Sequence, residues 1–150
     1  MSEKELGQEQ QTRLDIAVGK LGKLNQGQAD YLVPEGYSAV YRTNAFTRHG
    51  EHGNALLTRW PVQDVAHEDL SDHRFEQRGL LHVRVAVDGN PVHVLVMHLG
   101  LLAGGRERQV QRLANYLERR VPPGERLVVA GDFNDWGDRL RRPMAALSLR

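Results

Sequence analysis

The chain of 150 residues contains no cysteine, which excludes disulfide bonds, thiolate metal sites and a cysteine nucleophile. Long apolar runs are also missing, so the sequence predicts no membrane-spanning segment. The formal net charge is only +1, which makes no case for a strongly basic protein that coats nucleic acid. The first ten residues lack the apolar core of a secretion signal. These absences predict a soluble protein of the cytoplasm.

The composition that remains is that of a folded domain. Hydrophobic residues make up 40% of the chain and charged residues 26%, as in ordinary globular proteins. The length corresponds to one domain with a sizeable core. No repeat or low-complexity linker divides it, so we expect a single domain over residues 1–150.

Hydrophobic periodicity predicts a mixed α/β chain. The clearest signal is the alternation of Leu81, Val83 and Val85 before the turn signal Asp88-Gly89, which predicts a β-hairpin. The polar stretch 42–53 is interpreted as a loop. Residues 127–130 are consecutively apolar, which predicts a strand buried on both faces. The expected helices cover 8–25, 29–33, 106–120 and 138–149, and the expected strands cover 37–41, 55–58, 80–87, 92–98 and 127–130.

The segment Gly131-Asp-Phe-Asn-Asp-Trp136 carries the most chemical information in the sequence. Asp132 and Asn134 follow a predicted strand and are two residues apart, so they project to the same side if the extended geometry persists. A carboxylate can orient water or bind Mg²⁺, and an amide can donate to a phosphate oxygen. The alternative is a strand-end turn capped by Asx side chains, and the tripeptide alone does not decide between the two.

His98 ends another predicted strand, on the same face as Val92, Val94 and Val96. A histidine in that place is either a satisfied core or edge group, or a phosphate ligand or proton donor.

Taken together, these motifs resemble the endonuclease/exonuclease/phosphatase family. The resemblance spans about residues 35–137 and matches a bacterial subgroup of the family. It rests on the order of its motifs, which is more specific than any one of them. They are Gly53-Asn-Ala-Leu-Leu-Thr-Arg-Trp-Pro61, Arg78-Gly79, His98-Leu-Gly-Leu101, Arg106-x-x-Gln109 and Gly131-Asp-Phe-Asn-Asp135.

The resemblance implies a deoxyribonuclease-like α/β (α+β) fold, a two-sheet β-sandwich flanked by helices, and a Mg²⁺- or Mn²⁺-dependent hydrolase of phosphoesters. By carry-over, Asp132 orients or activates the attacking water, Asn134 holds the scissile phosphate and His98 stabilises the developing charge. Asn54 and Arg78 are the implied substrate-binding residues. The substrate classes of the family are nucleic acids, phospholipid headgroups and inositol phosphates, and the loops that select among them do not identify one here.

The sequence departs from the family at both ends. The Asn of the first strand, the metal-binding Glu of the next strand and the C-terminal Asp-His pair have no counterpart, so Asp132 is the only metal ligand that the motifs suggest. We therefore expect an incomplete domain, weak or inactive as an isolated enzyme. Two alternatives stay open: a non-catalytic remnant that binds phosphate or protein partners, and a fragment that does not fold alone.

Other polar clusters receive structural interpretations. Ser71-Asp72-His73 has the letters of the family's last motif but lies in the wrong order, so we interpret it as accidental. His49 and His52 are assigned to a surface loop. Three arginines at 139, 141 and 142 are interpreted as a solvated helix face.

Overall fold

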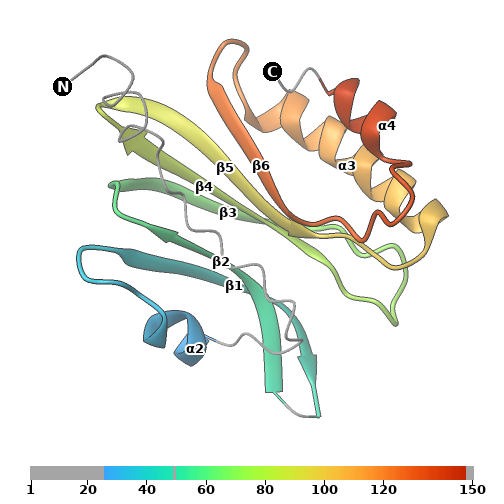
Figure 1. Ribbon diagram of the computed structural model, residues 1–150, viewed down its shortest axis with the longest axis horizontal. Helices are drawn as coiled ribbons and strands as arrows, with labels where there is room; N and C mark the ends of the chain where they lie inside the picture. The colour runs from blue at the N-terminus through green and yellow to red at the C-terminus, as the bar shows by residue number, and fades with distance from the viewer. Residues whose placement is uncertain (1–25, 49, 148–150) are drawn as a thin grey trace.

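The computed structural model describes residues 26–48 and 50–147 as two β-sheets with helices on their outer sides (Figure 1). The predicted helix 8–25 lies outside these residues. No helix in the described ranges is long and apolar enough to cross a membrane. The helices are α2 (Gln26–Tyr31), α3 (Ala103–Arg120) and α4 (Arg141–Ala145). The strands are β1 (Ser38–Thr47), β2 (Gly50–Thr58), β3 (Val62–Asp69), β4 (Gly79–Val87), β5 (Asn90–His98) and β6 (Arg126–Asp132).

The larger sheet has the strand order β3-β4-β5-β6, and β1 and β2 form the smaller one. Strands β3, β4 and β5 are antiparallel neighbours, whereas β6 runs parallel to β5 after the crossover through α3. The turn between β4 and β5 consists of Asp88 and Gly89, both with positive φ, as a two-residue hairpin requires. The predicted hairpin is confirmed.

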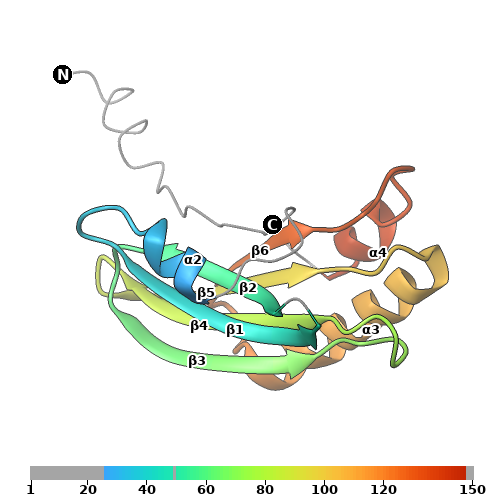
Figure 2. The same ribbon diagram turned by 90° about the horizontal axis from the view of Figure 1, so that it is seen from below.

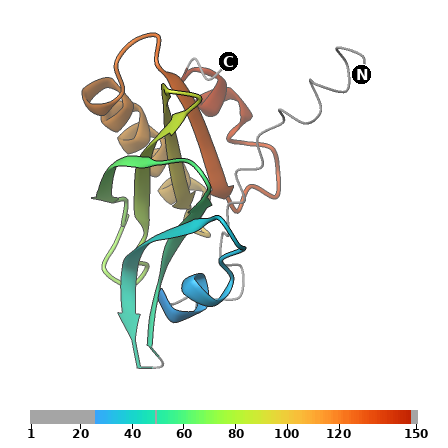
Figure 3. The ribbon, with the colours of Figure 1, turned by 90° about the vertical axis from the view of Figure 1, so that its left-hand side faces the viewer.

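Two apolar cores lie on opposite faces of the larger sheet. One packs Leu80, Leu95 and Met97 against Leu113 and Leu117 of α3. The other packs Leu81, Val83, Val94 and Val96 against Leu56 of the smaller sheet. Figures 1 and 3 show α3 and α4 beyond one face and the smaller sheet with α2 beyond the other. The predicted two-sheet sandwich with outer helices is therefore confirmed.

Several predicted boundaries are wrong. Residues 42–53 are not a loop, because most of them continue β1 and β2 as a hairpin with exposed and half-buried polar side chains. Strand β3 was not predicted, since its mostly exposed face gives little apolar periodicity. The side chains of β6 are half-buried rather than enclosed on both faces. Within the described residues 138–147 the last helix covers 141–145, and 148–149 of the expected helix lie outside the described residues.

Candidate active site at the carboxyl ends of β5 and β6

The parallel pairing of β5 and β6 brings His98 and Asp132 together. These residues are register partners at the carboxyl ends of the two strands, which Figures 1 and 2 show side by side. The strands approach closely at Gly131, whose φ is +152°. A Cβ at this position would lie 1.8 Å from the carbonyl oxygen of Met97, so glycine is required there. The backbone thus fixes the spacing of the two candidate groups.

Asp132 and Asn134 form a tight turn immediately after β6. The backbone N–H of Asn134 donates to Asp132 Oδ1 at 3.0 Å, and Asn134 has φ +49°, a conformation that Asn tolerates. The side-chain amide nitrogen of Asn134, Nδ2, donates to the carbonyl oxygen of Leu99 at 2.8 Å. The Asx-capped turn is therefore present. It also ties the motif to the segment that follows His98.

The second carboxylate oxygen of Asp132 faces His98, with 3.9 Å between Oδ2 and Nε2. Burial lowers the pKa of His98 below its ordinary value, and the charge of Arg78 lowers it further, while Asp132 and Glu76 oppose the shift. The imidazole is consequently neutral at neutral pH. One ring nitrogen carries a proton to donate and the other can accept one.

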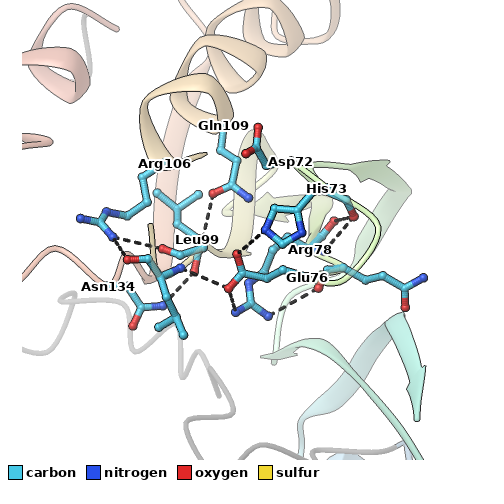
Figure 4. A network of polar contacts seen from close by, with 12 residues as sticks. Asp72, His73, Glu76, Arg78, Leu99, Arg106, Gln109 and Asn134 are labelled. Carbon is cyan, nitrogen blue, oxygen red and sulfur yellow. Dashed lines mark hydrogen bonds and ion pairs between the residues drawn. The ribbon is translucent and has the colours of Figure 1, made fainter. Parts of the chain in front are cut away.

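Arg78 and Glu76 form an ion pair beside His98, with 2.9 Å between Nη2 and Oε1 (Figure 4). The same Glu76 oxygen accepts the backbone N–H of Leu101 at 3.2 Å, so the pair ties the segment before β4 to the one after β5. Glu76 Oε2 lies 3.8 Å from His73 Nε2. Sequence reasoning identified Arg78 but missed Glu76, whose only signal was its place two residues before the Arg-Gly motif.

Arg106 and Gln109 at the start of α3 fix the backbone that follows His98. The side chain of Gln109 accepts the N–H of Gly100 at 2.8 Å and donates to Leu70 O at 3.0 Å. The guanidinium of Arg106 donates to the carbonyl oxygens of Gly100 and Leu101. Figure 4 shows both side chains reaching toward this segment from the helix. Their role in the structure is to hold the loop beside the candidate site.

Asn54 lies inside the protein between the two sheets. Its amide nitrogen donates to Gly79 O at 2.8 Å and to Val96 O at 3.0 Å, and the residue is 2% exposed. Both amide hydrogens are therefore engaged with the backbone of β4 and β5. In the structure, Asn54 links the two sheets through these hydrogen bonds. Its contact with a substrate stays a prediction.

The remaining predicted clusters have partners other than His98 and Asp132 or lie on the surface. Asp72 receives two hydrogen bonds from Arg108 of α3, at 2.7 and 2.6 Å, and these lower the pKa of its carboxyl. His52 is part of β2 rather than a loop, and burial, aided by Arg78, lowers its pKa. Arg141 is exposed and lies 3.7 Å from Asp138.

The donor set for a divalent cation is thin among the described residues. Mg²⁺ prefers carboxylate oxygens, and Asp132 is the described carboxylate at the strand ends. Within residues 26–48 and 50–147, no three His, Cys, Asp or Glu side chains group so that they could hold a metal. These residues alone do not fit a complete metal centre, so no chemical step is derived through one.

Comparisons with known proteins identify the family of the chain and its fold. A family model described as Endonuclease/Exonuclease/phosphatase family matches residues 5–147. The uncharacterized protein YbhP of Escherichia coli K12 is 39% identical over 107 residues, which are 70% of this chain and 42% of YbhP. The chain thus spans less than half the length of the curated relatives that it matches.

Three solved structures share the fold at identities below 25%. Danio rerio TDP2, complexed with a single-strand DNA product, has a TM-score of 0.62 and 15% identity, covering 81% of this chain and 49% of TDP2. Sphingomyelinase C from Streptomyces griseocarneus has a TM-score of 0.52 and 24% identity, with coverages of 65% and 39%. The mannosyl-6-phosphatase of Bacteroides thetaiotaomicron has a TM-score of 0.56 and 14% identity, with coverages of 67% and 43%.

Proposed function

Because the chain belongs to the endonuclease/exonuclease/phosphatase family, we propose that it acts on phosphoester bonds at the carboxyl ends of β5 and β6. The observation that carries the proposal is the juxtaposition of His98 and Asp132 by strand register. Carboxyl ends of parallel strands are where open α/β sheets place their ligands. The substrate is a nucleic acid, a phospholipid headgroup or an inositol phosphate.

In the proposed reaction a water molecule attacks phosphorus in line with the departing alcohol. The new P–O bond forms as the ester P–O bond breaks, and the alcohol leaves with the proton that the water gives up. Asp132 orients the water through Oδ2, the oxygen that the turn of Asn134 leaves free. His98, held neutral by burial and by Arg78, donates one N–H to a phosphate oxygen.

Family membership supports Mg²⁺ or Mn²⁺ as the cofactor, which would neutralise charge on the phosphate. Asp132 is the described residue that would contribute to its binding. Since the described residues supply so few ligands, we expect turnover by the isolated 150-residue chain to be weak.

The test is hydrolysis of bis(p-nitrophenyl) phosphate by the 150-residue chain with Mg²⁺, with Mn²⁺ and with EDTA. Asp132→Asn keeps the shape of the side chain and removes its charge, so we expect at least a 100-fold loss of the metal-dependent rate. Asp138→Asn is the matched control, because this exposed carboxylate pairs with Arg141 instead. An unchanged rate in Asp132→Asn would exclude the proposed role of the strand ends.

The thin donor set specifically favours a second candidate, a domain that binds phosphate without turnover. His98 and Arg78 provide donors for an anion even when no metal is held. Phosphate binding measured by calorimetry, equal with Mg²⁺ and with EDTA and accompanied by no hydrolysis, would support this candidate over the enzyme.

A further inference from the structure

A pocket of about 630 Å³ lies between the hairpin of β1 and β2 and the segment 74–78 that precedes β4. The motifs of the sequence do not account for it. It is lined by Ala45, Phe46, Thr47, His52, Arg74, Phe75, Glu76, Gln77 and Arg78.

Two largely exposed aromatic side chains line this pocket. Phe46 is 79% exposed and Phe75 is 80% exposed. The guanidinium of Arg74 lies over the ring of Phe75, 4.6 Å from its centroid. Exposed phenylalanines that line a concave site mark a surface for binding an apolar or planar group. Arginine beside such a ring adds a cation that attracts anions and stacks on π-systems.

The loop that carries Phe75 is firmly anchored at its base. The Oγ atom of Ser71 accepts the N–H of Arg78 at 3.0 Å, and Leu70 N donates to Arg78 O at 2.9 Å. The bidentate contact of Arg108 with Asp72 fastens the same loop to α3. An exposed ring on an anchored loop loses little conformational freedom when it binds, which favours a recognition role over accidental exposure.

The pocket also holds unmet hydrogen-bonding capacity. In the described part of the chain, two buried side-chain nitrogen atoms lack a partner, His52 Nδ1 and Arg78 Nε, and both residues line this pocket. Buried polar atoms without partners are rare, and a bound ligand is one of their explanations. Glu76 of the pocket accepts the backbone N–H of Leu101, three residues after His98, so the pocket adjoins the candidate phosphoester site.

We propose that this pocket binds the unpaired base of a nucleotide whose phosphate lies at His98 and Asp132. The inference rests on the proposed function and assigns it a substrate class, single-stranded nucleic acid. Phe46 and Phe75 provide stacking surfaces, which suit any base and are unavailable to bases stacked in a duplex. Arg74 supplies positive charge for the backbone, because the charge of Arg78 is paired with Glu76. An acyl chain would leave the polar atoms of the pocket unsatisfied, so a lipid fits less well.

The experiment measures binding of fluorescent single-stranded decamers and of the matching duplex by anisotropy, with EDTA present to prevent cleavage. We expect Phe46→Ala and Phe75→Ala each to weaken single-strand binding about tenfold. Phe75→Leu should weaken it similarly, because leucine keeps hydrophobicity but loses stacking, whereas Phe75→Tyr should retain it. Tyr31→Ala is the matched control, since Tyr31 is 89% exposed on α2 and does not line the pocket.

Three results would overturn the inference. They are equal affinity for duplex and single strand, equal losses in Tyr31→Ala and Phe75→Ala, and retained affinity in Phe75→Leu. Binding to phosphatidylcholine vesicles that depends on Phe46 and Phe75, without oligonucleotide binding, would assign the pocket to a lipid surface.

Failure of this inference is distinguishable from failure of the proposed function. In the Asp132→Asn chain, hydrolysis of bis(p-nitrophenyl) phosphate should be lost, whereas Phe75→Ala should still weaken decamer binding by the same factor as in the wild-type chain. Hydrolysis without base-dependent binding would refute the proposed base-binding role of the pocket but leave the proposed enzymatic function intact. Decamer binding that depends on Phe75, in a chain without hydrolytic activity, would refute the enzymatic function and support the base-binding role of the pocket.

Discussion

Arg78 connects the two parts of the candidate site. Its charge is the largest influence on the pKa of His98 after burial, and it acts in the same direction on His52. Glu76 holds the guanidinium at 2.9 Å and is itself tied to the backbone of Leu101. The protonation of the imidazole therefore depends on a loop that also forms the wall of the pocket.

We predict that Arg78→Gln raises the pKa of His98 toward its ordinary value, because it removes a positive charge that disfavours the imidazolium. The measurement is an NMR titration of the His98 ring proton. Arg74→Gln is the control, since this exposed arginine of the same loop is not among the causes of the shift. Equal shifts in the two variants, or none in Arg78→Gln, would show that Arg78 does not set the charge of His98.

At the scale of elements, a chain of mostly buried polar groups joins α3 and the loop before β6 to strands β4 and β5 of the larger sheet. The hydroxyl of Tyr116 lies 2.9 Å from His82 Nδ1, and His82 Nε2 lies 2.7 Å from His93 Nδ1. His93 Nε2 contacts Glu125, which precedes β6. Because a carboxylate only accepts, His93 Nε2 donates to Glu125, His82 Nε2 donates to His93 Nδ1, and the hydroxyl of Tyr116 donates to His82 Nδ1. Each contact then has one donor and one acceptor with both rings neutral.

This chain predicts a loss of stability in mild acid. Burial, followed by the charge of His93, lowers the pKa of His82 from 6.5 to about 4. As the pH falls below 6.5, His82 becomes protonated in the unfolded chain but stays neutral in the folded chain until the pH approaches 4. The free energy of unfolding therefore decreases between pH 6.5 and pH 4, by at most about 3 kcal/mol from this group.

Urea unfolding at pH 7 and at pH 4.5 measures the effect. His82→Gln keeps hydrogen-bonding capacity without titrating, so its stability should change less between the two pH values than that of the wild type. The exposed His73→Gln serves as the control and should retain the wild-type difference. Identical differences in all three proteins would contradict the assignment to His82.

Sequence patterns predicted some elements and missed others for physical reasons. The hairpin of β4 and β5 was predictable, because Leu81, Val83 and Val85 alternate before a turn that requires positive φ. The full hairpin of β1 and β2 was not, because polar residues and glycines interrupt the apolar periodicity between 42 and 53. The motifs predicted the proximity of His98 and Asp132. Glu76 was missed because its role arises from contacts between loops that are distant in sequence.

For the molecule as a whole, the interface between the two sheets decides whether the described chain unfolds as one cooperative unit. Leu56 of β2 is fully buried among valines and leucines of the larger sheet. Asn54 adds two hydrogen bonds from β2 to the backbone of β4 and β5. Since apolar burial and polar bonding both cross this interface, we expect the sheets to unfold together.

The predicted outcome is a single thermal transition, coincident when followed by far-UV circular dichroism and by tryptophan fluorescence. Asn54→Leu should lower the free energy of unfolding by about 2 kcal/mol, because it removes two buried hydrogen bonds between the sheets. Asn115→Leu, on the exposed side of α3, should change it by less than about 0.5 kcal/mol. Two separate transitions in the wild-type chain would contradict the single unit.

The close approach of β6 to β5 at Gly131 has a consequence for engineering. In a library that randomises the surroundings of the site, functional clones should all keep glycine at 131, where any side chain would collide with the main chain at Met97. Phe75 and Gln77 can vary without disturbing the main chain at the strand ends, because both side chains are exposed at the edge of the pocket. New ligand preferences can thus be selected at the rim while the main chain keeps the reacting groups in place.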